Sequence, residues 1–136
     1  MGRRLRALAA SGAAALSACA APPDPPAAGA APELEGALWV LRSIEGAPAP
    51  PGVTLAFAGD EFRGAAPCNR YFGRFAHEGR AIEIGAIAAT RRACPQIETE
   101  RRYFAALADV ALVERDGHDL RLLGPDSTPR LVFRDE

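Results

Sequence analysis

A cysteine set among small and turn-forming residues constrains this chain more than any other feature. The stretch Gly64–Gly73 contains Cys68, followed by an asparagine that favours turns and by two aromatic residues. Cys94 follows after two runs of strand-forming residues. A disulfide between the two cysteines would close a ring of about 27 residues and stabilise the fold by roughly 3 to 4 kcal/mol in the chain-entropy model.

The first 18 residues have the layout of an export signal. Arg3, Arg4 and Arg6 form a positively charged start, and Ala7–Leu16 forms a short apolar segment. That segment is about ten residues long, whereas a helix needs ~20 to cross a bilayer. A cleaved secretory signal peptide over residues 1–18 is therefore predicted. Twin-arginine export is an alternative, but the residues around the arginine pair match its signal poorly.

The end of this segment, Leu16-Ser17-Ala18-Cys19, resembles the bacterial lipobox, in which the cysteine receives diacylglycerol, the peptide is cut and the new amine is acylated. The resemblance implies a lipid attachment at Cys19, and two or more acyl chains give lasting anchorage. Ala20 implies sorting to the outer membrane, because in such lipoproteins a residue there other than Asp usually permits it. The alternatives are an ordinary signal peptide with an incidental cysteine, and retention in the inner membrane.

Residues 19–32 are predicted to form a tether between the lipid and the folded domain. Five prolines lie among alanines and glycines here, a composition that favours extended polyproline II segments and cannot bury a core. At ~3.1 Å per residue, the tether could hold the domain up to roughly 40 Å from the lipid surface.

Residues 33–136 are predicted to form one domain of about eight short strands and one helix. Leu38–Ile44 is rich in strand formers, and Val53–Ala58 alternates with a period of two. Asp116-Gly117 is a hairpin signal between two further runs. The remaining strands are expected near Phe62, Tyr71–Phe75, Ile82–Ile87 and Leu131–Phe133.

One helix is predicted over Gln96–Leu107, where the apolar period changes to that of a helix and Glu98 is placed to pair with Arg102. Its expected buried face contains Ile97, Phe104, Leu107 and Ala108. The fold class is therefore mainly β: a small, antiparallel, strongly curved sheet or barrel with the helix packed on it. The aromatic residues predicted to be in the core are Trp39, Phe57, Phe72, Phe75 and Phe104.

Export would place the two remaining cysteines in an oxidising compartment, where disulfides persist. With Cys19 assigned to lipid, Cys68 and Cys94 are predicted to pair. The alternative is two separately buried thiols, because free cysteine packs well as a small apolar residue.

Two segments around these cysteines resemble those of META domains. Pro67–Gly73 is similar to their Gly-Cys-Asn-x-x-x-Gly segment, and Thr90–Cys94 to their Thr-Arg-Met-Ala-Cys segment. Pro67 stands where the family has Gly, and Arg92 where it has Met. The similarity covers residues 35 to 134. The motif positions that match are Cys68, Asn69, Gly73, Thr90, Arg91, Ala93 and Cys94.

This resemblance implies a module of the heat-inducible protein HslJ type, a small lipocalin-like barrel with one helix that is common on bacterial envelope lipoproteins. Members of the family are associated with heat or envelope stress and with novobiocin resistance. No enzymatic activity is established for them.

The other residues that could carry chemistry favour structural roles. His77 and His118 fall at predicted turns, and a zinc site built from Cys68, Cys94 and one histidine lacks Cys-x-x-Cys spacing. Nucleophile and phosphate-binding motifs are absent from the sequence, so no catalytic residue, metal or cofactor is expected. Asn69 is predicted to bond its own backbone in a turn. Adjacent acids such as Glu98 and Glu100 are predicted to be solvated.

Charge argues against a nucleic-acid partner. The chain has no lysine, and its 16 arginines nearly balance 17 acidic residues, while a mature chain beginning at Cys19 would carry about −4. Arg91-Arg92 and Arg101-Arg102 could form one positive patch. Such a patch would be a solubilising face or, alternatively, a contact for lipid A phosphates, an anionic cell-wall polymer or an acidic partner.

The sequence therefore predicts a non-catalytic, periplasm-facing envelope lipoprotein with a stress-related, structural or binding role. It is expected to be a monomer held at the membrane by acyl chains on Cys19, with an envelope protein or glycan as candidate partners. One alternative is a binder of a small apolar ligand inside the barrel. Another is a protein-binding lipoprotein of the lysozyme-inhibitor or pilot type, which would need a more distinctive protruding loop than Ala47–Gly52. A hydrolase is the weakest alternative.

Overall fold

The computed structural model describes residues 32–136. The predicted signal peptide, Cys19 and the tether up to residue 31 lie outside the described residues. Within the described segment, no helix has the length and apolar character needed to span a bilayer.

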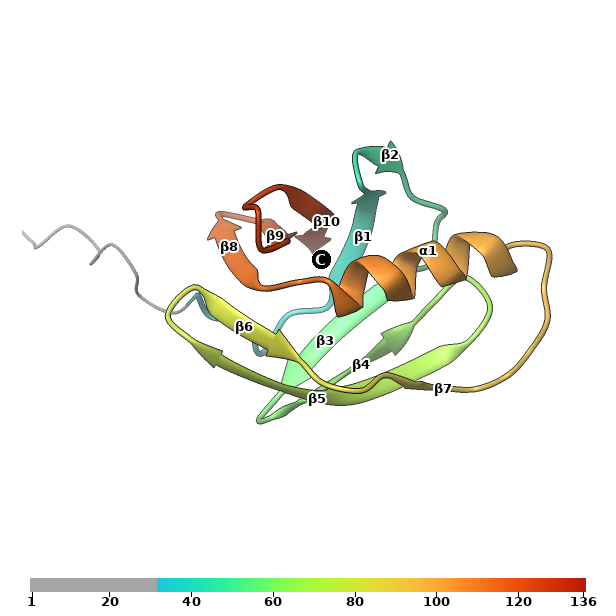
Figure 1. Ribbon diagram of the computed structural model, residues 1–136, viewed down its shortest axis with the longest axis horizontal. Helices are drawn as coiled ribbons and strands as arrows, with labels where there is room; N and C mark the ends of the chain where they lie inside the picture. The colour runs from blue at the N-terminus through green and yellow to red at the C-terminus, as the bar shows by residue number, and fades with distance from the viewer. Residues whose placement is uncertain (1–31) are drawn as a thin grey trace, which may run out of the picture.

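Eight antiparallel strands form a closed barrel with one helix, which confirms the predicted fold class (Figure 1). The ring runs β1–β3–β4–β5–β6–β8–β9–β10, and β10 pairs with β1 to close it. The two-residue strands β2 and β7 pair with β1 and β5 outside this ring. The elements are β1 (Trp39–Ile44), β2 (Ala47–Pro48), β3 (Thr54–Ala58), β4 (Glu61–Ala65), β5 (Arg70–Glu78), β6 (Ala81–Ile84), β7 (Ala88–Ala89), α1 (Ile97–Ala108), β8 (Leu112–Asp116), β9 (Asp119–Leu123) and β10 (Pro129–Asp135).

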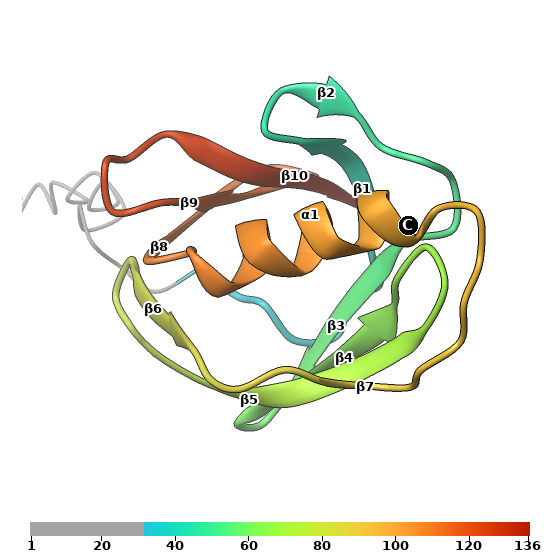
Figure 2. The same cartoon turned by 45° about the vertical axis from the view of Figure 1, so that its right-hand side comes forward.

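The pairing between β6 and β8 is the shortest in the ring. A single residue pair, Ala81 with Leu112, connects the two strands. The Val113 N–H donates to the Arg80 carbonyl (2.8 Å), and the Arg80 side chain pairs with Glu114. Figure 2 shows α1 lying between the arc of β8, β9, β10 and β1 and the arc of β3 to β7, so that the helix closes the interior.

Side chains from the strands and from α1 fill the inside of the barrel. Strand residues alternate between inside and outside, and α1 adds three inward residues, Tyr103, Ala106 and Leu107. This filled interior argues against an enclosed apolar ligand. The largest fully buried side chains are Trp39, Leu55, Phe62, Tyr71, Tyr103, Leu107, Leu120, Leu122, Leu131 and Phe133.

Phe72 was wrongly predicted to be in the core, since it is 63% exposed. Tyr71 and Phe75 occupy the inward positions of β5, and the period of two therefore turns Phe72 outward. Trp39, Phe57 and Phe75 are buried and Phe104 is partly buried. The prediction is confirmed for those four.

The predicted helix is confirmed to within one residue at each end, but its buried face differs. Glu100, Tyr103 and Leu107 are buried, whereas Ala108 is exposed. Glu98 forms its ion pair with Arg101 (2.6 Å) rather than with Arg102 as predicted.

Both histidines are exposed, and one lies in a predicted turn. His118 follows Gly117 in the two-residue turn between β8 and β9, because Asp116 pairs with Asp119. Gly117 has φ of 59°, which glycine adopts without strain at the first position of a hairpin turn. His77 instead lies within β5, opposite Ile82, which corrects its predicted place in a turn.

Candidate functional site

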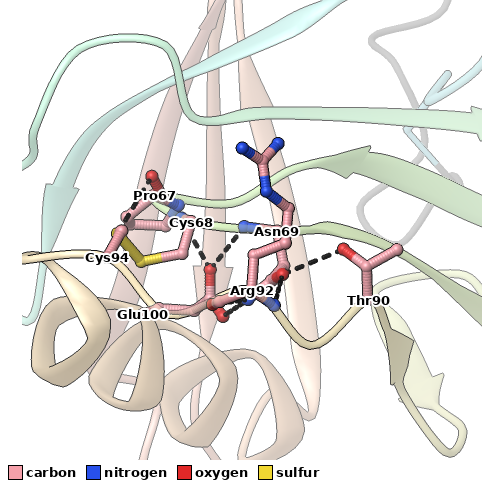
Figure 3. The surroundings of a disulfide bond; sticks show 7 residues. All are labelled: Pro67, Cys68, Asn69, Thr90, Arg92, Cys94 and Glu100. Carbon is pink, nitrogen blue, oxygen red and sulfur yellow. Dashed lines mark hydrogen bonds between the residues drawn. A yellow bond between two sulfur atoms is a disulfide. The ribbon is translucent and has the colours of Figure 1, made fainter.

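Cys68 and Cys94 form a disulfide, which confirms the predicted pairing (Figure 3). Their Cα atoms lie 5.7 Å apart, at the usual spacing for such a bond. The bond joins the turn between β4 and β5 to the segment that leads into α1. Cys94 Sγ also lies 3.9 Å from the Pro67 carbonyl oxygen, a contact without a hydrogen bond because a disulfide sulfur carries no proton.

A buried carboxylate lies beside the disulfide. Glu100, in the first turn of α1, is 4% exposed. Its Oε2 accepts hydrogen bonds from the backbone N–H groups of Cys68 (2.7 Å) and Asn69 (2.8 Å), and its Oε1 accepts one from Asn69 Nδ2 (2.6 Å). The negative charge also lies at the positive end of the helix dipole. These interactions offset the cost of burying a carboxylate, which the sequence had predicted to be solvated.

Asn69 connects this carboxylate to a third segment. Its Oδ1 accepts hydrogen bonds from the Arg92 N–H (2.6 Å) and from Thr90 Oγ1 (2.9 Å), and its Nδ2 donates to the Arg92 carbonyl (3.1 Å). The side chain is 5% exposed. The predicted local turn role of Asn69 is therefore wrong, because its amide bonds residues distant in sequence. We call Asn69, Thr90, the Arg92 backbone and Glu100 the Asn69 network.

The network explains several positions of the motif. Arg92 contributes only its backbone to Asn69, and its side chain is exposed, so an arginine is tolerated where a methionine is usual. Thr90 Oγ1 both donates to Asn69 and accepts from the Arg70 N–H (3.2 Å). Arg91 and Ala93 are exposed, and nothing in the structure explains their place in the motif.

Gly73 makes room for an aromatic ring inside the barrel. It pairs with Phe62 across the β4–β5 ladder, and a Cβ added to it would clash with that ring and lie 2.7 Å from the Ala86 carbonyl oxygen. Gly64 pairs with Tyr71, and a Cβ added to it would clash with the Thr54 carbonyl oxygen on β3 and lie 2.7 Å from the Tyr71 hydroxyl. Both positions therefore need glycine for packing rather than for backbone freedom.

The hydroxyl groups of two buried tyrosines, Tyr71 and Tyr103, contact each other inside the barrel. Tyr71 donates to the Thr54 carbonyl (2.7 Å), and its hydroxyl oxygen lies 2.5 Å from that of Tyr103. Burial raises the pKa of both hydroxyls above the ordinary value of 10.0, and for Tyr103 the neighbouring Tyr71 raises the pKa further. The pair is therefore neutral at every physiological pH.

We expect the tyrosine pair to make the domain sensitive to alkaline pH. Because the pKa is raised in the folded state, the two hydroxyls stay protonated to a higher pH in the folded protein than in the unfolded chain. Their contribution to stability is therefore fully present below about pH 10 and is lost as the pH rises above it. The loss should approach ~1.4 kcal/mol per pH unit for each tyrosine. Urea unfolding between pH 8 and pH 11.5 measures it, and the chain contains no lysine and no other tyrosine that would titrate in this range. Tyr103→Phe should roughly halve the slope, and a wild-type curve without a slope would contradict the expectation.

A groove lies on the outer face of the barrel, over β3, β4 and β5. Its volume is about 640 Å³. Leu38 (45% exposed) and Phe72, the large apolar side chains that are exposed within residues 32–136, both line it. We call this surface the outer groove. The lining residues used below are Leu38, Thr54, Ala56, Glu61, Arg63, Ala65, Arg70, Phe72 and Thr90.

Register brings the groove residues side by side. Ala56 on β3 pairs with Arg63 on β4, which in turn pairs with Phe72 on β5. Ala65 pairs with Arg70 in the next outward row. The outer groove therefore combines a floor of small residues with two arginines and two exposed apolar side chains, a site that sequence reasoning missed.

The predicted positive patch is partly neutralised by ion pairs. It contains Arg91, Arg92, Arg101 and Arg102. Arg101 pairs with Glu98 (2.6 Å), and Arg102 approaches Glu45 (4.0 Å). Across residues 32–136, no group of three or more His, Cys, Asp or Glu side chains is arranged to hold a metal ion.

Solved structures of low sequence identity share this fold. A crystal structure of a DUF4847 family protein from Bacteroides vulgatus is 17% identical with a TM-score of 0.53, and the match covers 61% of this chain but only 58% of that protein. An NMR structure of a protein from Burkholderia xenovorans is 24% identical with a TM-score of 0.56 and covers 87% of this chain and 99% of that one. A further NMR structure is 22% identical, with a TM-score of 0.58 and coverage of 74% and 90%.

No curated protein matches the sequence. The family model described as META domain, in contrast, matches residues 32–136, which is the whole of the described segment. That span includes the disulfide, both glycines of the β4–β5 ladder and the Asn69 network. The chain therefore belongs to the META domain family.

Proposed function

We propose that this chain is a non-catalytic envelope lipoprotein, anchored through Cys19, whose barrel binds envelope components on its outer face in a structural or stress-related role. One observation carries the binding role. Exposed apolar and cationic side chains gather in the outer groove, while the barrel interior is filled by its own side chains. A partner would therefore be held on the surface rather than inside.

The competing functions have less support. A small apolar ligand inside the barrel would have to displace aromatic side chains that are fully buried. A protein-binding role of the inhibitor or pilot type would use a protruding loop, but Ala49 of the Ala47–Gly52 loop packs against the core. The outer groove is the better surface for a partner of any class.

Fractionation of cells that express the full chain tests the anchoring. We expect wild-type protein in the membrane fraction, with precursor accumulating when globomycin blocks lipoprotein processing. Cys19→Ala removes the thiol that would receive lipid, so this variant should be lost from the pool of mature membrane protein. A Cys19→Ala chain that is processed normally and stays in the membrane fraction would contradict the anchor.

A further inference from the structure

We propose that the outer groove docks the barrel on the surface of an anionic phospholipid bilayer. Leu38 and Phe72 enter the interfacial region, while Arg63 and Arg70 pair with lipid phosphates. This inference rests on the proposed function in one respect, because lipid on Cys19 would keep the domain next to the bilayer.

The apolar part of the groove has no partner within the described segment. Leu38 and Phe72 are 45% and 63% exposed, although side chains of this size are buried elsewhere in the domain. Ala56 and Arg63 lie in one row with Phe72 across β3, β4 and β5, and Leu38 directly precedes β1, which pairs with β3. Exposed apolar side chains that gather on one face mark an interaction surface.

The charge of the groove opposes that of the domain. Residues 32–136 contain 13 arginines and 16 acidic residues, a net charge of −3. Arg63 and Arg70 nevertheless form no ion pair within that segment, while Glu61 at the groove's edge approaches Arg74 (3.7 Å). Two unpaired arginines beside exposed apolar groups attract an anionic lipid surface.

The two hydroxyl groups that line the groove give little support to a sugar. Thr54 Oγ1 accepts the Ala65 N–H (3.1 Å), and Thr90 Oγ1 is bonded to Asn69 and Arg70. Both hydroxyls are thus already bonded within the fold. Among the described residues, the arginines are the free donors of the groove, and an arginine binds a charged phosphate more strongly than a neutral hydroxyl.

Strand pairing disfavours an added peptide strand. β4 lies between β3 and β5, β3 also pairs with β1, and β5 also pairs with β6 and β7. These strands therefore lie inside the closed ring and leave no full edge for a peptide to extend. The side chains of the groove that are free to interact are therefore apolar or cationic, and they favour an apolar, anionic partner.

The predicted length of the tether is compatible with this orientation. β5 has nine residues and spans roughly 30 Å, whereas the predicted tether reaches up to about 40 Å. An anchored domain could therefore lie with β3, β4 and β5 against the bilayer.

Quenching by brominated lipid tests the docking. The acylated full chain is reconstituted in vesicles of phosphatidylglycerol and phosphatidylcholine, or of phosphatidylcholine alone. Phe72→Trp places a fluorophore in the groove, and Val132→Trp on β10 is the matched control, since Val132 is half-buried and turned outward on a strand outside the groove. The native Trp39 is fully buried and supplies a constant background.

We expect the Phe72→Trp signal to be quenched at least about twofold more than the control in anionic vesicles. High salt should abolish the difference because it screens exposed charges, and Arg63→Gln with Arg70→Gln should do the same. Equal quenching of the two tryptophans would overturn the docking. A second result would also overturn the docking: the chain associates with itself in detergent, and Phe72→Ser abolishes this association. A second copy of the chain would then cover the groove.

Flotation separates this proposal from the proposed function. A chain that floats with the vesicles but shows no groove-specific quenching overturns the docking and leaves the anchor intact. A chain without acyl groups that fails to float overturns the anchor alone. In that case a Cys19→Ser full chain, added to the same anionic vesicles, should still show salt-sensitive quenching of Phe72→Trp that depends on Arg63 and Arg70, and its absence would overturn the docking.

Discussion

Replacing Glu100 with alanine should lower the free energy of unfolding by about 3 to 5 kcal/mol. The carboxylate accepts two backbone N–H groups and the Asn69 amide in a buried site, so its removal leaves three donors without a partner. A buried unsatisfied donor costs roughly 1 to 3 kcal/mol. Urea unfolding followed by circular dichroism at pH 7 would measure the loss.

Glu98 provides the matched control for this prediction. It lies in the same helical turn and is exposed, and its ion pair with Arg101 lies at the surface. Glu98→Ala should therefore change stability by less than about 0.5 kcal/mol. Glu100→Gln should fall between the two alanine variants, because the amide keeps one acceptor oxygen but turns its own N–H groups toward other donors. A Glu100→Ala variant as stable as Glu98→Ala would show that the Asn69 network does not hold α1 on the barrel.

Loss of the disulfide should cost about 3.5 kcal/mol, since the chain-entropy model gives this value for a ring of this size. The bond closes a separation of 26 residues that includes β5, β6 and β7. The Cys68→Ser/Cys94→Ser chain should unfold at lower urea than the oxidised wild type, with a reduced wild type matching it. Reductant should leave the double variant unchanged. Equal midpoints for oxidised and reduced wild type would contradict the stabilising role.

The two predictions should couple, because Cys68 carries one of the N–H groups that Glu100 accepts. Without the disulfide, the turn between β4 and β5 can open and expose these groups to water. Glu100→Ala should then cost less in the Cys68→Ser/Cys94→Ser background than in the wild type.

Local periodicity was sufficient to predict most of the fold. The alternation in Val53–Ala58 and the helical period from Gln96 gave elements close to β3 and α1. The disulfide was predictable because only two cysteines remained once Cys19 was assigned to lipid. Each of these inferences depends on neighbouring residues or on a count.

Features that depend on long-range pairing could not be predicted in this way. Glu100 resembles any acidic residue in a first helical turn, and its partners lie about 30 positions earlier in the chain. Asn69 was assigned to a local turn for the same reason. The outward direction of Phe72 was within reach, because Tyr71 and Phe75 share the opposite parity in β5.

The outer groove could not be predicted from the sequence either, because it also depends on long-range pairing. Leu38, Arg63 and Phe72 come from three separate parts of the chain, and only the pairing of β1 with β3 and the register of β3, β4 and β5 bring them together. A pattern search over the sequence finds an isolated arginine and two ordinary apolar residues, because nothing local marks them as neighbours.

Intact mass spectrometry of the mature protein, isolated from membranes and alkylated without reductant, is the most direct test of the proposed envelope lipoprotein. Processing at Cys19 predicts a chain of residues 19–136 that carries acyl groups at its first residue and takes up no alkylating agent at Cys68 or Cys94. An unmodified N-terminus together with two alkylated cysteines would contradict both the anchor and the oxidised barrel.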